Sequence, residues 1–412
     1  MHDATPETLL VDELPAARRC LRVACVTETY PPEVNGVAMT IARVVEGLHR
    51  RQHSVQLVRP RQPARGQAGN AGDIDEVLTR GLPIPRYPQL RMGMPSRREL
   101  VRLWSLQRPD VVHVATEGPL GWSAVQAARH LRLPTSSDFR TNFHPYSRHY
   151  GVAWLQRPIL AWLRKFHNAT GATMVPTRAL ERELSAQGFQ RLAVVARGVD
   201  TERFDPQRRD PALRQEWGAS DTSLVVLCVG RLAAEKNLLL AVEAFEALAP
   251  RHGDARLVFV GDGPLREELA RRCPRAFFAG RRDGLDLAAH YASADLFLFP
   301  SLTETFGNVT PEAMASGLPV LAFDDAAAAA LIRSGHNGVL VPCGDPSEYV
   351  RTAVALAASA ELRRAIAAQA RSTALTLGWD RILDQFESVL DSVMAHGPVR
   401  KTRPAAALPR TA

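Results

Sequence analysis

A pair of glutamates, Glu304 and Glu312, lies in the stretch TETFGNVTPEAMASG (residues 303–317), with seven residues between them. Two carboxylates can act as the acid and the base of a hydrolytic reaction on sugars. Here, however, an apolar run that predicts a buried strand ends at about residue 300, and a helical pattern begins at about residue 308. Such a junction favours ligand binding over hydrolysis, because the start of a helix attracts anions.

The predicted helix start indicates a phosphate site. Gly307 permits a close approach of the backbone to a ligand, and the backbone N–H groups of Gly307, Asn308 and Val309 would point outward without a helical partner. Glu312 follows in the first helical turn, where a carboxylate can accept both hydroxyls of a ribose. The alternative is that Glu312 only offsets the helix dipole and that the first glutamate is an exposed loop acid.

Two cations stand at another strand end, in the stretch VGRLAAEKN. Arg231 directly follows an apolar run, and Lys236 comes shortly before the next predicted helix. An arginine forks onto phosphate oxygens and a lysine adds a mobile point charge, so the two match the charges of a pyrophosphate. The alternative is a pair of solvated surface cations.

Two further stretches carry candidate residues. In TETYPPEVNGVAM, Gly36 opens a predicted helix and would let a phosphate or a sugar approach the backbone. In SSDFRTNFHPYSRHYG, the side chains of Asp138, Arg140 and His144 are candidates for lining a cleft, with a structural role as the alternative for each.

Several nucleotide and metal motifs are absent from the sequence. It has no G-x-G-x-x-G and no Walker loop, so binding of NAD is not expected. It has no H-E-x-x-H and no Cys/His cluster, so we expect chemistry without a metal or other cofactor, in which Arg231, Lys236 and helix dipoles replace a cation. The five cysteines form no C-x-x-C pair and are interpreted as reduced thiols of a cytoplasmic protein.

Strand-like apolar runs precede the main candidate stretches, and these runs alternate with helical patterns. That alternation indicates a parallel sheet covered on both faces, and the pattern occurs twice. The sequence therefore predicts an α/β protein with two Rossmann-like, doubly wound domains that face a cleft, where ligands bind at the carboxyl ends of the strands.

The same pattern predicts the domain boundaries. Residues 199–221 are polar and contain prolines, which is typical of a linker. We expect the following segments: a flexible tail (1–18), a first domain (19–200), a second domain (201–378), a closing helix that can return to the first domain (379–396), and a disordered tail (397–412).

The charge is unevenly distributed. Residues 1–200 carry 27 lysines and arginines against 17 aspartates and glutamates, whereas the remaining residues carry 24 against 26. A basic first half favours an acidic partner, either a phosphorylated substrate or an anionic membrane surface, with a merely basic soluble surface as the alternative. Nucleic acid is not expected, because its recognition motifs are absent. There is no signal peptide and no apolar stretch long enough to span a membrane, although residues 153–168 can form an interfacial helix.

Taken together, the motifs resemble glycosyltransferase family 4, whose members are retaining, use nucleotide sugars and have the GT-B fold. The resemblance covers about residues 21–395 and is carried by ETYPPEVNGV, VGRLAAEKN, FVGDGPLREEL, ASADLFLFPSLTETFGNVTPEAMASGLPVLA and HNGVLVPCGD. It implies that Glu304 contacts the transferred sugar, Glu312 the ribose, and Arg231 and Lys236 the diphosphate. It also implies that Gly36 and the backbone of residues 307–309 pack against the donor phosphate.

The sequence departs from the family at one position. Many relatives have histidine in an F-H-T motif beside the sugar, whereas this sequence reads F-R-T, with Arg140 at that place. Either Arg140 or the nearby His144 would then contact the sugar.

The local match is to bacterial α-mannosyltransferases and sulfoquinovosyl-diacylglycerol synthases. It implies transfer of a hexose, with GDP-mannose as the first candidate donor and a UDP-sugar as the second, to a lipid or glycan acceptor at the inner membrane face. A nucleotide-sugar epimerase or a phosphorylase on the same fold is the alternative. The sequence leaves the oligomeric state open.

Overall fold

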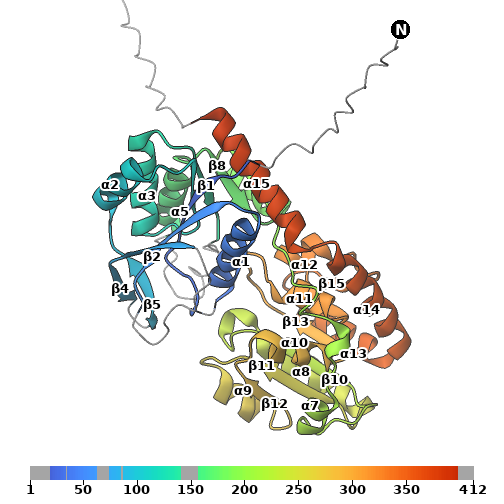
Figure 1. Ribbon diagram of the computed structural model, residues 1–412. Coiled ribbons are helices and arrows are strands. Elements are labelled where there is room, and N and C mark those ends of the chain that lie inside the picture. The colour runs from blue at the N-terminus through green and yellow to red at the C-terminus, as the bar shows by residue number, and fades with distance from the viewer. Residues whose placement is uncertain (1–18, 34, 63–73, 85–86, 141–155, 398–412) are drawn as a thin grey trace, which may run out of the picture.

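The computed structural model of the chain describes residues 19–33, 35–62, 74–84, 87–140 and 156–397, and it contains two parallel sheets (Figure 1). The strand order is β3-β2-β1-β6-β7-β8-β9 in the first sheet and β12-β11-β10-β13-β14-β15 in the second. The strands of both sheets pair in parallel. The predicted α/β class with two doubly wound sheets is therefore confirmed.

The first half of the chain forms the first sheet, a small antiparallel hairpin and their helices. These elements are β1 (Arg22–Val26), α1 (Gly36–Arg50), β2 (Ser54–Pro60), β3 (Asp75–Thr79), β4 (Gly81–Ile84), β5 (Tyr87–Gly93), α2 (Arg97–Leu106), β6 (Val111–Val114), α3 (Pro119–Leu131), β7 (Thr135–Asp138), α5 (Gln156–His167), β8 (Ala172–Val175), α6 (Arg178–Ala186) and β9 (Leu192–Val194).

The second half forms the second sheet and its helices. These elements are α7 (Pro211–Glu216), β10 (Val225–Val229), α8 (Leu238–Leu248), β11 (Arg256–Val260), α9 (Arg266–Arg272), β12 (Phe277–Gly280), α10 (Gly284–Ala292), β13 (Leu296–Phe299), α11 (Val309–Ala315), β14 (Val320–Phe323), α12 (Ala326–Leu331), β15 (Val339–Val341), α13 (Pro346–Ala358), α14 (Ala360–Leu375) and α15 (Trp379–His396).

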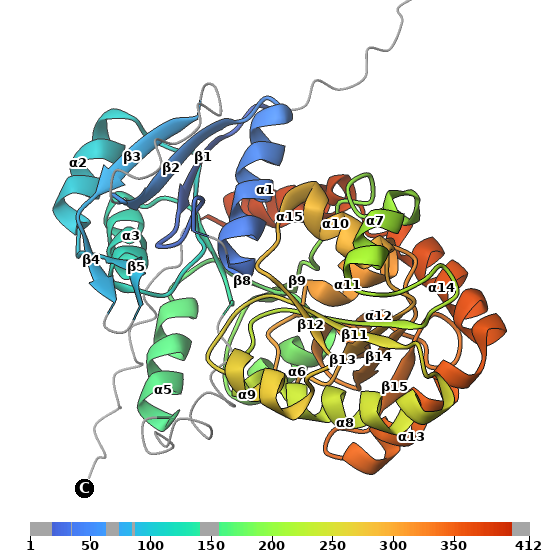
Figure 2. The ribbon, with the colours of Figure 1, turned by 90° about the horizontal axis from the view of Figure 1, so that it is seen from below.

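Each sheet is buried on both faces, and the central strands show why. Along β1, Val23 and Cys25 pack with α1 and α15, whereas Ala24 and Val26 pack with α2 and α3 on the other face. Successive side chains of a strand point to opposite faces, so a strand covered on both sides must be apolar throughout. The same alternation places one face of β10 against α8 and α13 and the other against α11 and α14. Figure 2 shows helices on both sides of each sheet.

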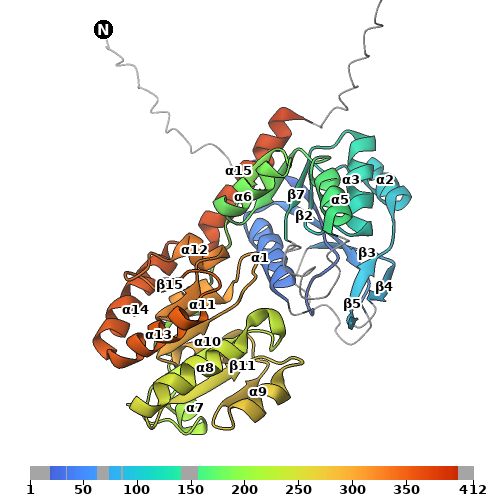
Figure 3. The ribbon, with the colours of Figure 1, turned by 180° about the vertical axis from the view of Figure 1, so that it is seen from behind.

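The last helix, α15, runs from the second half onto the first (Figures 1 and 3). Its residues Phe386 and Leu390 belong to the core between α1 and the first sheet. A Cβ atom on Gly47 of α1 would lie 2.3 Å from Leu383, so glycine is what allows the two helices to approach this closely. Arg51 adds an ion pair to Asp384 at 2.7 Å.

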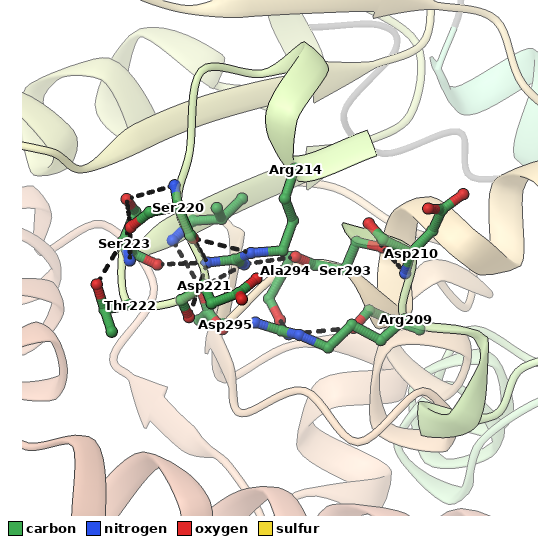
Figure 4. A network of polar contacts seen from close by, with 12 residues as sticks. Arg209, Asp210, Arg214, Ser220, Asp221, Thr222, Ser223, Ser293, Ala294 and Asp295 are labelled. Atoms are coloured by element: carbon green, nitrogen blue, oxygen red, sulfur yellow. Dashed lines mark hydrogen bonds and ion pairs between the residues drawn. The ribbon is translucent and has the colours of Figure 1, made fainter. Parts of the chain in front are cut away.

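Most of the segment that was predicted as a polar linker, residues 199–221, packs with the second half instead of standing apart from it. Phe204 and Trp217 lie in the core of the second half, and α7 stands between them. Arg214 of α7 is 1% exposed, and its guanidinium N–H groups donate to a carboxylate and several backbone carbonyls (Figure 4), namely Asp295 and Ser220, Asp221, Ser223 and Ser293. The polar residues that suggested a linker instead satisfy a buried network.

Within the described part of the chain, no helix combines the length and the apolar character that a membrane crossing requires.

Candidate functional site

The chain reverses its direction of travel across the second sheet between β10 and β13, which are hydrogen-bonded neighbours. In open α/β sheets, ligands bind outside the carboxyl ends of the strands at this point. Arg231 follows β10 there, and Glu304 lies in the loop after β13. Two stretches that are far apart in the sequence are therefore brought together by the strand order.

Lys236 and Glu304 form an ion pair at this position. Lys236 ends a short 3-10 turn (Ala234–Lys236), and its Nζ atom contacts Oε1 of Glu304. The same oxygen accepts a hydrogen bond from Oγ of Ser301 at 2.8 Å. The Lys236 ammonium lies 5.8 Å from the ring centre of Phe299. A cation and a carboxylate thus share one partly buried place, where they can meet a phosphate and a sugar hydroxyl.

Arg231 has a partner that the sequence analysis overlooked. Its guanidinium forms an ion pair with Glu235, whose side chain is 10% exposed. The backbone carbonyl of Glu235 also accepts hydrogen bonds from the N–H of Leu302 and the hydroxyl of Ser301. Glu235 therefore connects the loop that carries Arg231 with the loop that carries Glu304. The sequence did contain a signal for this role, because Glu235 stands between Arg231 and Lys236 in VGRLAAEKN.

The starts of two helices meet across the gap between the halves. Gly36 is the first residue of α1, and a Cβ atom there would lie 3.6 Å from Nδ2 of Asn308, which precedes α11. Gly307 has φ of 90°, and a Cβ atom there would lie 3.3 Å from the Phe299 ring. Val309 begins α11 and packs against the core of the second half. Because the N-terminal ends of helices carry partial positive charge, this gap suits an anion.

Glu312 lies in the first turn of α11, as predicted, and is partly buried. Desolvation raises the pKa of its carboxyl to about 7, opposed by a hydrogen bond from Tyr291 and by the charge of Arg203. The Tyr291 hydroxyl donates to Oε2 of Glu312 at 3.0 Å, which leaves the other carboxylate oxygen for a further donor. This geometry suits a diol such as a ribose.

Arg140 follows β7 of the first sheet, and its guanidinium forms an ion pair with Asp138. Its backbone carbonyl accepts a hydrogen bond from the hydroxyl of Thr305 at 3.3 Å, so Arg140 contacts the loop of the second half that carries Glu304. His144 lies outside the described residues. The structure therefore brings Arg140 close to the loop after β13, and its side chain is almost fully buried there.

The first sheet has its own buried acid, which the sequence analysis did not single out. Glu28 follows β1, and its Oε1 atom accepts a hydrogen bond from the backbone N–H of Leu120 at the start of α3. Desolvation raises the pKa of Glu28 to about 7, opposed by backbone hydrogen bonds. A Cβ atom on Gly118 would lie 2.1 Å from the Glu28 carboxylate, so a residue with a side chain at position 118 would displace this carboxylate. Glu28 thereby fixes the start of α3 against β1.

A cavity of about 330 Å³ lies between the halves, beside Glu304. The wall from the first half is largely apolar but also contains Thr177, Glu183 and Gln187, whereas the wall from the second half is mostly polar. The lining includes Phe139, Leu160, Leu163, Leu180, Thr305 and Asp325. An apolar cavity next to a polar cluster can hold the apolar part of a substrate.

The sequence matches two family descriptions. Residues 34–203 match "Glycosyltransferase Family 4", and residues 223–359 match "Glycosyl transferases group 1". Together the two matches cover most of both sheets and include the loops after β10 and β13.

Individual proteins agree with this assignment. The chain is 37% identical over 376 residues to a GDP-mannose-dependent alpha-mannosyltransferase of Mycobacterium tuberculosis, a match that covers 90% of this chain and 97% of that protein. It is 30% identical over 312 residues to the sulfoquinovosyl transferase SQD2 of Arabidopsis thaliana, covering 74% of this chain and 60% of that one. The crystal structure of Anabaena HepE in complex with UDP and glucose superimposes with a TM-score of 0.73 at 19% identity, and the match covers 90% of this chain and 100% of that chain. The chain therefore belongs to glycosyltransferase family 4, and it is a glycosyltransferase that uses a nucleotide sugar.

Proposed function

We propose that the chain transfers mannose from GDP-mannose to the hydroxyl of a lipid or glycan acceptor, with retention of configuration and without a metal ion. The observation that carries the proposal is the Lys236–Glu304 ion pair at the carboxyl ends of β10 and β13, close to the meeting of Gly36 and Asn308. The choice of donor is supported by the mycobacterial relative that is named as GDP-mannose-dependent.

In this proposal the second half holds the donor. Lys236, Arg231 and the N-terminus of α11 stabilise the diphosphate as it leaves, because fixed positive groups in a dry cleft are already oriented toward the developing charge. Glu304 binds the hydroxyls of the transferred sugar, and Glu312 binds the ribose. Both arginine and lysine have to release their carboxylate partners, at least in part, when the diphosphate binds.

In the same proposal, the first half binds the acceptor. The acceptor hydroxyl attacks the anomeric carbon from the face that the diphosphate leaves, and a phosphate oxygen of the leaving group takes its proton. The C–O bond to the phosphate breaks as the new glycosidic bond forms. The hydrogen bond from the Thr305 hydroxyl to the backbone carbonyl of Arg140 joins the two halves, and this supports a transfer that needs donor and acceptor side by side.

The apolar cavity beside Glu304 supports a lipid-bearing acceptor. The helix α5, which borders this cavity, also carries Trp162 at 36% exposure, and Lys165 lies 5.5 Å from the ring of Trp122. An exposed tryptophan beside cations suits the interface of an anionic membrane. We propose peripheral contact at this helix, on the cytoplasmic face of the membrane.

Binding and transfer test the proposal together. Thermal shift measurements with GDP, UDP and ADP should show the largest stabilisation with GDP, which at about 100 times its Kd amounts to about 2.7 kcal/mol.

Transfer of labelled mannose from GDP-mannose to a lipid extract should be reduced by more than about a hundredfold in Lys236→Ala, because an electrostatic contact to the leaving group is lost.

The controls separate the remaining possibilities. Arg251→Ala, a change at an exposed cation outside the cleft, should retain full activity. Activity that is lost in EDTA and restored by Mg²⁺ would contradict transfer without a metal. A changed sugar nucleotide without any acceptor would indicate an epimerase, and release of sugar phosphate from a glycan and inorganic phosphate would indicate a phosphorylase.

A further inference from the structure

Two arginines beside the candidate site are buried without a full set of hydrogen-bond acceptors. Arg140 follows β7 and Arg197 follows β9, and each side chain belongs to a residue that is 7% exposed. Nη2 of Arg140 donates to Asp138, and Nη1 of Arg197 donates to the hydroxyl of Thr40 at 3.2 Å. Within the described residues, Nε and Nη1 of Arg140 and Nε of Arg197 have no acceptor.

The neighbouring charges do not supply the missing acceptors. Asp138 bonds to Arg140, and the Glu117 carboxylate accepts the backbone N–H of Arg140 at 3.4 Å rather than its guanidinium. His113 is buried, and desolvation lowers its pKa to about 4, so it is neutral at physiological pH. Desolvation, followed by the charge of Arg140, lowers the pKa of Arg197 to about 9, which leaves it a cation.

A buried arginine with a structural role looks different in this chain. Arg214 is at least as buried, yet its donors reach the backbone carbonyls and the carboxylate described above (Figure 4). Leaving buried guanidinium donors without acceptors costs free energy, and such a cost persists where a ligand later provides the acceptors. Arg140 and Arg197 therefore resemble half of a binding site rather than part of the core.

The position of the pair connects it to the candidate site. Thr40, the hydrogen-bond partner of Arg197, donates to the backbone carbonyl of Gly36 at 2.7 Å. The Arg197 guanidinium lies 5.8 Å from the ring centre of Phe306, and Thr305 contacts the carbonyl of Arg140. The pair thus lies between the start of α1 and the loop after β13. That loop contacts both arginines.

We propose that Arg140 and Arg197 bind an anionic oxygen group, a carboxylate, phosphate or sulfonate, carried by the acceptor. The inference rests on the proposed function, because it places this group in the same cleft, beyond the diphosphate. Guanidinium groups match such anions well, since each can donate two parallel hydrogen bonds to neighbouring oxygens.

The ligand-free protein provides the first test. Arg197→Met removes a buried cation with unsatisfied donors, so the melting temperature without ligand should rise or stay unchanged. A marked fall would mean that Arg197 supports the fold and would overturn the inference. Arg197→Lys keeps the charge but loses the forked geometry, and it serves as the second variant in the binding measurement.

Binding of inorganic phosphate in the presence of saturating GDP provides the second test. GDP occupies the diphosphate site, so any further stabilisation by phosphate reports another anion site. The phosphate Kd should increase at least about tenfold in Arg197→Met or Arg197→Lys, because a forked contact is lost. The matched control is Arg43→Gln: Arg43 also lies on the first half near the junction, but it is already paired with Asp200 at 2.5 Å. Equal weakening in the control and in the Arg197 variants would overturn the inference.

Paired ligands identify the source of the anion. A preference of the wild type, lost in Arg197→Met, for a nucleotide hexuronate over the corresponding neutral nucleotide hexose would place the anion on the transferred sugar, which would contradict both mannose as that sugar and the acceptor as the source of the anion. The same preference for glycerol 3-phosphate over glycerol would assign it to the acceptor. Stabilisation by GDP with no phosphate effect and no preference in either pair would overturn the anion site alone. Absence of stabilisation by any nucleotide would instead contradict the proposed function.

Discussion

At the scale of single residues, the candidate site is held together by oppositely charged pairs that a donor would have to rearrange. Lys236 with Glu304 and Arg231 with Glu235 are each partly buried pairs of one cation and one carboxylate. Pairing keeps these charges compatible with partial burial when no ligand is bound. A diphosphate that competes for the cations releases the carboxylates for sugar hydroxyls, so one binding event would orient both kinds of group.

The pKa of Glu312 leads to a prediction for nucleotide binding. Its carboxyl is raised to about 7 by desolvation, and accepting two ribose hydroxyls favours the ionised form. Binding of GDP should therefore release a proton below that pKa, and its Kd should fall by up to about tenfold per pH unit as pH rises toward about 7, then level off. Isothermal titration from about pH 5.5 to about pH 8.5 measures this dependence.

The control for this prediction is Glu312→Gln, which cannot ionise. It should bind GDP more weakly at about pH 8 and lose most of the pH dependence. The folded-state pKa lies above the usual value of 4.5, so the wild type also loses stability as pH rises from 4.5 toward about 7. The glutamine variant should therefore be the more stable protein at about pH 8 without ligand. A pH-independent Kd in the wild type would contradict contact between Glu312 and the ribose.

At the scale of elements, α7 shows how a polar segment becomes part of a core. Asp210 caps the helix by accepting the N–H of Ala212, and Pro211 occupies the first helical position. Arg214 then satisfies the backbone of the following turn, which otherwise would bury carbonyls without donors. The helix thereby closes one end of the second sheet.

A pair of arginines tests this account. Arg214 and Arg209 both contact Asp295, but the Arg209 side chain is 39% exposed and that of Arg214 is 1% exposed. Arg214→Ala should lower the free energy of unfolding by about 3 kcal/mol or more, because buried carbonyls and a carboxylate lose their donor. Arg209→Ala should change it by less than about 1 kcal/mol. Urea unfolding measures both, and similar losses in the two variants would contradict the role given to Arg214.

The elements that could be predicted from the sequence are those with strong apolar patterns. The runs at β1, β10, β11 and β13 are nearly continuous and buried on both faces, so their sequences alone identify them. The strand β3 (DEVLT) and the hairpin β4–β5 were missed: β3 lies at the edge of the first sheet and has only two apolar residues in a row, and the hairpin forms a separate two-stranded sheet. Most of the segment predicted as a linker packs with the second half because Arg214 makes polar residues compatible with burial.

The candidate site was predictable only in part, for a related reason. Local motifs pointed to Glu304, Glu312, Arg231, Lys236 and Gly36, because each follows a strand or opens a helix. Partners that depend on the packing of distant segments gave no such signal: Arg197 meets Phe306 across the gap, and Glu28 caps a helix that starts more than ninety residues later. The structure itself does not test the roles of these residues, which remain predictions for the experiments above.

At the scale of the whole molecule, α15 makes the first half depend on the end of the chain. Phe386 is 2% exposed and packs in the core of the first sheet, opposite the face that α2 and α3 cover. Phe386→Ala should cost about 3–5 kcal/mol of stability through loss of apolar contacts and the remaining cavity. Binding of GDP to the second half, measured well below the melting temperature, should be unchanged.

Calorimetry distinguishes this outcome from a general loss of structure. The transition of the first half should move to lower temperature, and addition of GDP should restore little of the difference. The control on the opposite side of the helix is Ser388→Ala; Ser388 is exposed, so this change should leave the transition in place. Strongly weakened GDP binding by Phe386→Ala would contradict the assignment of the main donor contacts to the second half.

The return of α15 has a mechanical consequence. The chain passes between the halves twice, near Gly198–Asp200 and again near Leu377–Trp379, and the two passages touch: the N–H of Val199 donates to the carbonyl of Leu377 at 3.0 Å, and a Cβ atom on Gly198 would lie 2.8 Å from Trp379. A single connecting segment would let the two halves twist as well as bend relative to each other. Two chain segments bonded side by side restrict twisting, so we expect any opening of the cleft to occur by bending about a single axis.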